Sequence, residues 1–103
     1  MIRLQWTARI SRGKNGEAIQ WAKETAEHLR SMYPKILAIG AYEEHFGNVN
    51  TIHIFSDYES LASLESVESQ YPSDAAFMEL QKKSNEGAFF IEGSIHGTLV
   101  RSL

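Results

Sequence analysis

The sequence contains no cysteine, which excludes a disulfide framework, a thiolate nucleophile and a zinc–thiolate cluster. It has only two prolines and no low-complexity tract, so a disordered or collagen-like chain is excluded as well. Its apolar runs are only a few residues long, whereas a helix that spans a bilayer needs about 20 apolar residues. Residues 1–6 show neither the apolar core nor the cleavage site of a secretory signal, so we expect a cytoplasmic protein without a membrane partner.

An excess of positive charge is also lacking. The chain carries 10 basic and 13 acidic residues, for a net charge of −3, which argues against nucleic acid as a main partner. Its apolar share of 43% and charged share of 22% are ordinary for a globular protein. With 103 residues, we expect a single domain that spans residues 1–103 and has one hydrophobic core.

The first half of the chain predicts a strand followed by a helix. Residues 2–10 alternate between apolar and polar side chains, a period of two that is typical of a half-buried strand. Turn-forming residues follow, and Asn15 is a candidate N-cap. We expect the helix over residues 16–33, because apolar side chains recur there every three or four positions until Pro34.

Residues 36–45 and 49–56 are predicted to pair as the two strands of a hairpin. The Gly-Asn dipeptide at residues 47–48 suits a two-residue hairpin turn. A turn at that position fixes the register and places Tyr42 opposite His53.

The last third of the chain predicts a broken helix and a final strand. Ser56-Asp57 is expected to cap a second helix, Pro72 to interrupt it, and Ser73 or Asp74 to restart it. Residues 89–100 alternate again and are predicted to form the last strand.

The predicted order is β-α-β-β-α-β, an α+β, ferredoxin-like arrangement with an antiparallel sheet. Both helices then cover one face of the sheet, so the other face, which we call the open face, lacks helices. The alternation of the strands assigns these residues to the open face: Arg3, Gln5, Thr7, Arg9, Tyr42, Glu44, Thr51, His53, Phe55, Phe90, Glu92, Ser94 and His96.

This open face is too apolar to remain in water and too charged to form a second core. Tyr42, Phe55 and Phe90 would make an exposed apolar patch, and the charged side chains need partners if they are buried. A homodimer that packs two open faces together satisfies both demands, and its eight strands enclose room for a small-molecule ligand. The alternative is a dimer seam in which aromatic and charged side chains neutralise one another without a ligand.

Five segments carry a resemblance to a known family: Arg12-Gly13-Lys14 after the first strand, Ile39-Gly40-Ala41-Tyr42-Glu43, Gly47-Asn48, Asp57-Tyr58-Glu59-Ser60-Leu61, and residues 73–80. Together they resemble the dimeric α/β-barrel superfamily, and most closely its NIPSNAP-like and antibiotic biosynthesis monooxygenase-like branches. The resemblance implies a homodimeric barrel and a role among cofactor-free oxygenases, haem-degrading enzymes, isomerases or dehydratases. Trp6 falls on the helix-facing side of the first strand and Trp21 on the first helix, so the Asn-Trp-His set of haem-degrading members is not matched.

Histidine titrates near neutrality, as a general acid or base must. Of the four histidines, His53 and His96 are expected on the open face, and with Tyr42 they are the candidate catalytic residues. The alternative is that each histidine is held by a carboxylate or the backbone in a purely structural role. We expect His28 and His45 at the surface. The candidate substrate-binding residues are Arg3, Arg9, Phe55, Phe90 and Glu92.

We expect no metal and no cofactor. His53, His96, Glu44 and Glu92 lack the close spacing of metal-ligand pairs, and residues 13–16 lack the spacing of a phosphate-binding loop. The sequence therefore predicts a small-molecule-binding homodimer. Two hypotheses are open: a cofactor-independent monooxygenase or isomerase that acts on a polar aromatic compound, and a non-catalytic ligand-binding or structural dimer.

Overall fold

The computed structural model describes all 103 residues and confirms the α+β fold with the order β-α-β-β-α-β. The elements are β1 (Ile2–Arg9), α1 (Asn15–Met32), β2 (Ala38–Glu43), β3 (Thr51–Tyr58), α2 (Leu61–Glu68), the short 3-10 helix η1 (Tyr71–Ser73), α3 (Ala75–Glu86) and β4 (His96–Arg101).

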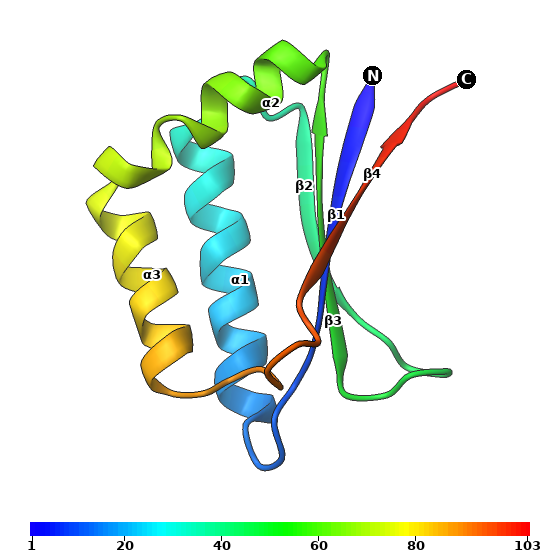
Figure 1. The fold of residues 1–103 in the computed structure, drawn as a ribbon, viewed down its shortest axis with the longest axis vertical. Coiled ribbons are helices and arrows are strands. Elements are labelled where there is room, and N and C mark those ends of the chain that lie inside the picture. The colour runs from blue at the N-terminus through cyan, green and yellow to red at the C-terminus, as the bar shows by residue number, and fades with distance from the viewer.

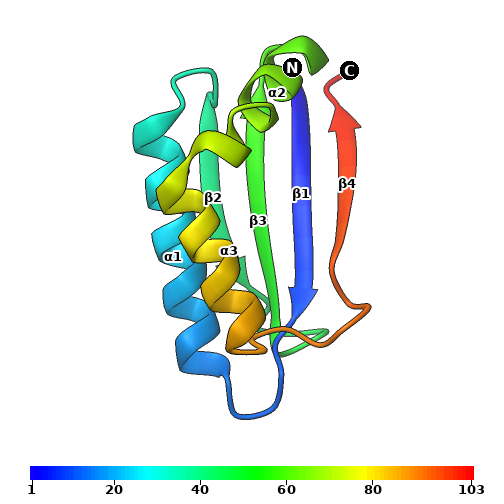
Figure 2. The same cartoon turned by 60° about the vertical axis from the view of Figure 1, so that its left-hand side comes forward.

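The four strands form one antiparallel sheet in the order β2-β3-β1-β4. All helices lie on one side of this sheet, and the other side carries none (Figure 1). Figure 2 shows β4 at the edge farthest from the helices, and all six of its residues are exposed. None of the helices combines the length and the apolar character needed to cross a membrane.

The core lies between the sheet and the helices. The apolar side chains of β1 face α1, as the alternation predicted, and Ala8 and Ile10 are buried there. Trp6 of β1 packs against Trp21 of α1 with ring centroids 5.5 Å apart. Phe90 completes this aromatic cluster, with centroids 5.3 Å from Trp6 and 5.2 Å from Trp21.

Two predicted helix caps are wrong. Asn15 is the first residue of α1, and its side chain donates to Oδ1 of Asn50 at 2.8 Å. Ser56 and Asp57 remain in β3, so α2 begins later with Ser60 as its N-cap. β3 continues through Asp57, which pairs with Arg3 of β1 and accepts two hydrogen bonds from its guanidinium.

The hairpin register is confirmed, but the two-residue turn is wrong. Tyr42 pairs with His53 as predicted, whereas residues 44–50 form a longer connection. Two residues of this loop have a left-handed backbone conformation, Gly47 at φ 92° and Asn50 at φ 63°. Glycine and asparagine tolerate that conformation best, so the loop sequence supports the wider turn.

The last strand is shorter than predicted, and this moves Phe90 to the other face. Phe90 bridges Ile10, while His96 pairs with Thr7. Phe90 and His96 are six positions apart in the chain, whereas their partners Ile10 and Thr7 are only three positions apart. Residues 91–95 therefore bulge out of the strand pairing. Because the excess is an odd number, the bulge reverses which face the side chains occupy.

Candidate functional site

The three candidate catalytic residues lie in one row across the open face. Tyr42 of β2 pairs with His53 of β3, His53 pairs with Thr7 of β1, and Thr7 pairs with His96 of β4. Opposed residues on neighbouring antiparallel strands have Cβ atoms about 5 Å apart. The row therefore places the imidazoles of His53 and His96 on the two strands that flank Thr7, and Tyr42 one strand further away, beyond His53.

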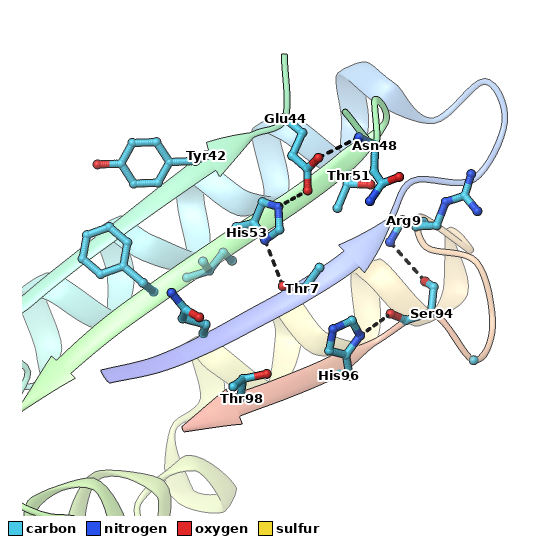
Figure 3. A pocket seen from close by; sticks show the side chains of 14 residues that line it. Thr7, Arg9, Tyr42, Glu44, Asn48, Thr51, His53, Ser94, His96 and Thr98 are labelled. Atoms are coloured by element: carbon cyan, nitrogen blue, oxygen red, sulfur yellow. Dashed lines mark hydrogen bonds and ion pairs between the residues drawn. The ribbon is translucent and has the colours of Figure 1, made fainter. Parts of the chain in front are cut away.

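His53 sits at the centre of a hydrogen-bonded chain (Figure 3). Its Nε2 lies 2.6 Å from Oε1 of Glu44, and its Nδ1 lies 2.9 Å from Oγ1 of Thr7. Thr7 belongs to β1 and His53 to β3, and Glu44 is the first residue after β2. The imidazole is thus fixed from both sides while 35% of the side chain remains exposed.

Glu44 is held in its charged form. The hydrogen bond from His53 and a second one from the backbone N–H of Asn48, at 2.8 Å, lower the pKa of Glu44 from its ordinary value of 4.5. A carboxylate only accepts, so Nε2 of His53 donates to Glu44. In the neutral imidazole, Nδ1 is then the acceptor, and the Thr7 hydroxyl donates to it. This order is the arrangement of a hydroxyl, a base and an orienting carboxylate.

The histidine faces a hollow of about 930 Å³ on the open face. Ligand cavities of small-molecule sites are commonly about 300–1,000 Å³. The lining is mostly polar, and it includes these residues: Gln5, Thr7, Arg9, Tyr42, Glu44, Asn48, Thr51, His53, Ile54, Phe55, Gly93, Ser94, His96 and Thr98.

One end of the hollow is aromatic. The rings of Tyr42 and Phe55 stack at 5.6 Å with an interplanar angle of 17°, and the guanidinium of Arg3 lies 4.3 Å from the centre of the Phe55 ring. A Cβ at Gly40 would come within 2.8 Å of this ring, so glycine is required there for the ring to lie against β2. Arg3 also binds Asp57 through two hydrogen bonds, of 2.7 and 3.0 Å. Its charge is therefore neutralised within the chain, and it supports Phe55 from outside the hollow.

The other end of the hollow is basic. The backbone N–H of Arg9 donates to Oγ of Ser94 at 3.1 Å, which ties the end of β1 to the bulge before β4. His96 donates from Nδ1 to the Ser94 carbonyl at 3.2 Å, so its Nε2 is the ring atom left for other partners. The Arg9 guanidinium makes no hydrogen bond or ion pair within the chain.

Most of the predicted open-face residues line the hollow, but Arg3, Phe90 and Glu92 do not. Arg3 lies outside it beside Phe55. Phe90 packs in the core against the tryptophans, and Glu92 lies exposed in the bulge without lining the hollow. The other two histidines also separate. His45 is exposed, as expected, whereas His28 is only 20% exposed and is paired with Asp74.

Sequence reasoning placed Thr7 on the correct face but missed its contact with His53. It also missed Asn48, whose backbone holds Glu44. The signal for the first contact was present in the predicted fold, because its first and third strands are neighbours and Thr7 lies near the middle of the first. No residue pattern indicated the second contact, which depends on the shape of the 44–50 loop.

The structure contains no group of three or more histidine and acidic side chains that could hold a metal ion. The pair of His53 and Glu44 is isolated in this respect, since His96 belongs to a different hydrogen-bonded group. Thr7, His53 and Glu44 are groups that can take part in acid–base chemistry.

Comparison with known proteins agrees with this fold. The NIPSNAP family model matches residues 8–94 of the chain. A NIPSNAP domain protein from Burkholderia xenovorans is similar in structure at 14% identity, with a TM-score of 0.78 over 100% of this chain and 95% of that one. No curated protein matches the sequence.

Two further solved structures extend the comparison. An antibiotic biosynthesis monooxygenase matches at 14% identity and a TM-score of 0.76, over 100% of this chain and 99% of that one. A protein from Agrobacterium tumefaciens matches at 13% identity and a TM-score of 0.80, over 100% and 94% of the two chains. At these identities the similarity shows the fold alone.

Proposed function

Because the chain belongs to the NIPSNAP family and holds a paired histidine in an open hollow, we propose that it is a cofactor-independent enzyme acting on a small polar aromatic compound. The observation that carries this proposal is the chain of hydrogen bonds from Thr7 through His53 to Glu44. A monooxygenase or an isomerase suits the site, since both reactions begin with removal of a proton from the substrate.

The first step moves two protons along this chain. Thr7 Oγ1 takes a proton from the substrate while its own hydroxyl proton passes to Nδ1 of His53. The imidazolium that forms keeps its bond from Nε2 to the Glu44 carboxylate, whose charge stabilises it. Thr7 is therefore the residue that touches the reacting atom, and Glu44 positions the base.

The substrate anion can then react in two ways. In an isomerase, the imidazolium returns the proton to a different carbon of the anion. In a monooxygenase, dioxygen is the oxidant: a methylene group becomes a carbonyl group, and the second oxygen atom leaves as water. This reaction needs no external reductant, so either route is compatible with an enzyme that uses only its own side chains.

The aromatic end of the hollow supports an aromatic substrate. Tyr42 is 61% exposed and presents a ring face beside Phe55, which is half-buried. Offset stacking on such a pair contributes about 0.5–1.5 kcal/mol beyond the area that it buries. A substrate ring on this pair would lie next to the row that contains His53 and Thr7.

The proposed enzyme is a homodimer in which two open faces pack together. The helices cover the opposite face only (Figure 2), and Val100 of β4, which pairs with the open-face residue Arg3, is 43% exposed. A second copy of the chain presents the same mixture of aromatic and basic side chains, and two-fold pairing is the commonest way to cover such a surface. Sedimentation equilibrium at micromolar concentration should give about twice the 11.6 kDa chain mass, and a stable monomer would contradict the pairing.

Solvent-deuterium exchange tests the proposed chemistry. Phenylpyruvate and its methyl ester both carry an acidic methylene group beside an aromatic ring, and NMR follows the loss of its proton signal. We expect the protein to accelerate exchange of at least one probe and the variant His53→Asn to abolish the acceleration. The matched control His45→Asn, at an exposed histidine outside the hollow, should behave as the unaltered protein.

A non-catalytic dimer is the competing function. It is favoured by the fact that both ring nitrogens of His53 already have partners within the chain, as in a structural network. Under this alternative, neither probe exchanges faster than in buffer, and His53→Asn weakens assembly instead. The two hypotheses therefore differ in the exchange measurement and in the effect of His53→Asn on sedimentation.

A further inference from the structure

We propose that the substrate is an aromatic carboxylate whose acidic group lies between its ring and its carboxylate, with Arg9 as the residue that binds the carboxylate. This inference rests on the proposed function and names the substrate class of the same site. It follows from the order of groups along the open face: first the aromatic rings, then the pair of Thr7 and His53, and then the Arg9 guanidinium.

Three consecutive rows of the sheet define this order. Phe55 pairs with Gln5, His53 pairs with Thr7, and the next row along β1 is that of Arg9. Neighbouring positions on one face of a strand are two residues, or about 7 Å, apart. The reacting hydroxyl of Thr7 thus stands midway between an aromatic end and a cationic end.

Arg9 differs from Arg3 in being free to bind a ligand. The two arginines lie on the same strand and the same face, six residues apart. Arg3 has both a bidentate carboxylate partner, Asp57, and a ring beneath its guanidinium, whereas the Arg9 guanidinium has neither. An arginine fork binds a carboxylate through two parallel hydrogen bonds, which gives direction as well as strength.

The acidic groups near the hollow do not cancel the charge of Arg9. Glu44 is the only acidic residue of the lining, and its two oxygens accept from His53 and from the Asn48 backbone. Glu92, on the bulge next to Arg9's partner Ser94, makes no ion pair with Arg9. The basic end therefore lacks an anion, and a substrate carboxylate supplies one.

The arrangement excludes simpler ligand classes. A neutral aromatic compound would leave Arg9 without a partner in a hollow that the second subunit closes, which is unfavourable. An aliphatic acid would leave the stacked pair of Tyr42 and Phe55 uncovered. An aryl 2-oxo acid such as phenylpyruvate carries both groups, with its acidic methylene group between the ring and the carboxylate.

The test compares phenylpyruvate with its methyl ester, which differs in charge alone at the far end. Isothermal titration calorimetry should show tighter binding of the acid to the unaltered protein. The variant Arg9→Gln should weaken binding of the acid by about 10- to 100-fold and leave the ester nearly unchanged, because a hydrogen bond to a charged group is lost. Arg9→Lys keeps the charge without the fork and should recover part of the affinity.

The control is Arg12→Gln, which makes the same change in net charge at an exposed turn outside the hollow. It should bind the acid as the unaltered protein does. Sedimentation of each variant shows whether the dimer is intact, since a loss of binding that follows a loss of assembly would assign Arg9 to the interface and overturn the inference.

The outcomes also separate this inference from the proposed function. Equal binding of acid and ester, or an unchanged preference in Arg9→Gln, would overturn the carboxylate assignment while exchange catalysis stands. Absence of exchange and of binding with both probes would overturn the proposed function and this inference together.

Discussion

The chain contains two histidine–carboxylate pairs, and they differ in which group lies at the centre. In the pair of His28 and Asp74 the carboxylate is central: it accepts from the imidazole at 2.7 Å, from the Tyr33 hydroxyl at 2.7 Å and from the Phe77 backbone at 3.0 Å. In the pair of His53 and Glu44 the imidazole is central, with the carboxylate on one nitrogen and a hydroxyl on the other.

The two pairs also differ in how exposed their central groups are. The Asp74 side chain is 4% exposed and caps α3. As an ionised carboxylate it accepts hydrogen bonds from both helices and so joins α1 to α3. The His53 side chain is 35% exposed and faces a hollow. From this difference we infer that the buried carboxylate of Asp74 has a structural role, whereas the partly exposed imidazole of His53 is the one placed to act on a ligand.

The largest expected effect concerns the central imidazole of the open face. The variant His53→Asn should reduce exchange catalysis by about 100-fold or more, because a positioned base contributes that much. Its free energy of unfolding should change by less than about 1 kcal/mol, since the pair is partly solvated. Exchange rates and urea denaturation measure the two quantities, and a large loss of stability with normal exchange would reverse the assignment.

The next effect concerns the central carboxylate of the helix pair. The variant Asp74→Ala removes the N-cap of α3 and leaves the buried hydroxyl of Tyr33 without its acceptor. The free energy of unfolding should fall by about 3 kcal/mol, the sum of a lost cap and an unpaired buried group. Urea denaturation measures this loss. Glu44→Ala is the matched control, and an equal loss of stability there would remove the distinction between the pairs.

The loss of stability in acid should also depend on Asp74. Burial alone would raise the pKa of Asp74, but the hydrogen bonds from Tyr33, His28 and the Phe77 backbone hold it below its ordinary value of 3.8. A carboxyl group with a lowered pKa stabilises the fold at pH above its unfolded value and loses this contribution as the pH falls through the folded value. Asp74→Ala should therefore flatten the decline of stability below about pH 4, as thermal melts in acid would show. A decline as steep as in the unaltered protein would contradict this role.

The smallest expected effect concerns His28, the imidazole that donates to Asp74. The variant His28→Asn removes one of three donors to Asp74 and keeps the other two, so the free energy of unfolding should fall by about 1 kcal/mol. Tyr33 continues to donate, because burial and then Asp74 raise its pKa to about 12. Exchange catalysis should be unchanged. A fall in exchange would place His28 in the functional site.

The alternation of the strands made the open face predictable. Every second residue of a strand lies on one face, so the apolar positions of β1 identified Arg3, Thr7 and Arg9 as open-face residues. The register of the hairpin was predicted from a two-residue turn at Gly47-Asn48; the turn is wrong, but the register is confirmed, because Tyr42 pairs with His53. A shift of one residue would have put the apolar set on the wrong face, which burial does not allow.

Local irregularities were not predictable in this way. The bulge at 91–95 moves Phe90 into the core, and nothing in the alternation of residues 89–100 indicates where pairing is interrupted. The positive φ of Gly93, at 82°, marks the bulge only once the structure is known. The hydrogen bond from the Asn48 backbone to Glu44 was not predictable either, because it depends on the shape of the 44–50 loop.

One titration compares the two pairs directly. Phenylpyruvate is added to isotopically labelled protein, and the imidazole signals of His53 and His28 are followed together by NMR. The account predicts that the His53 signals shift in a saturable manner while those of His28 stay in place. A shift of His28, or no shift of His53 at saturating ligand, would contradict the assignment of the open face as the functional site.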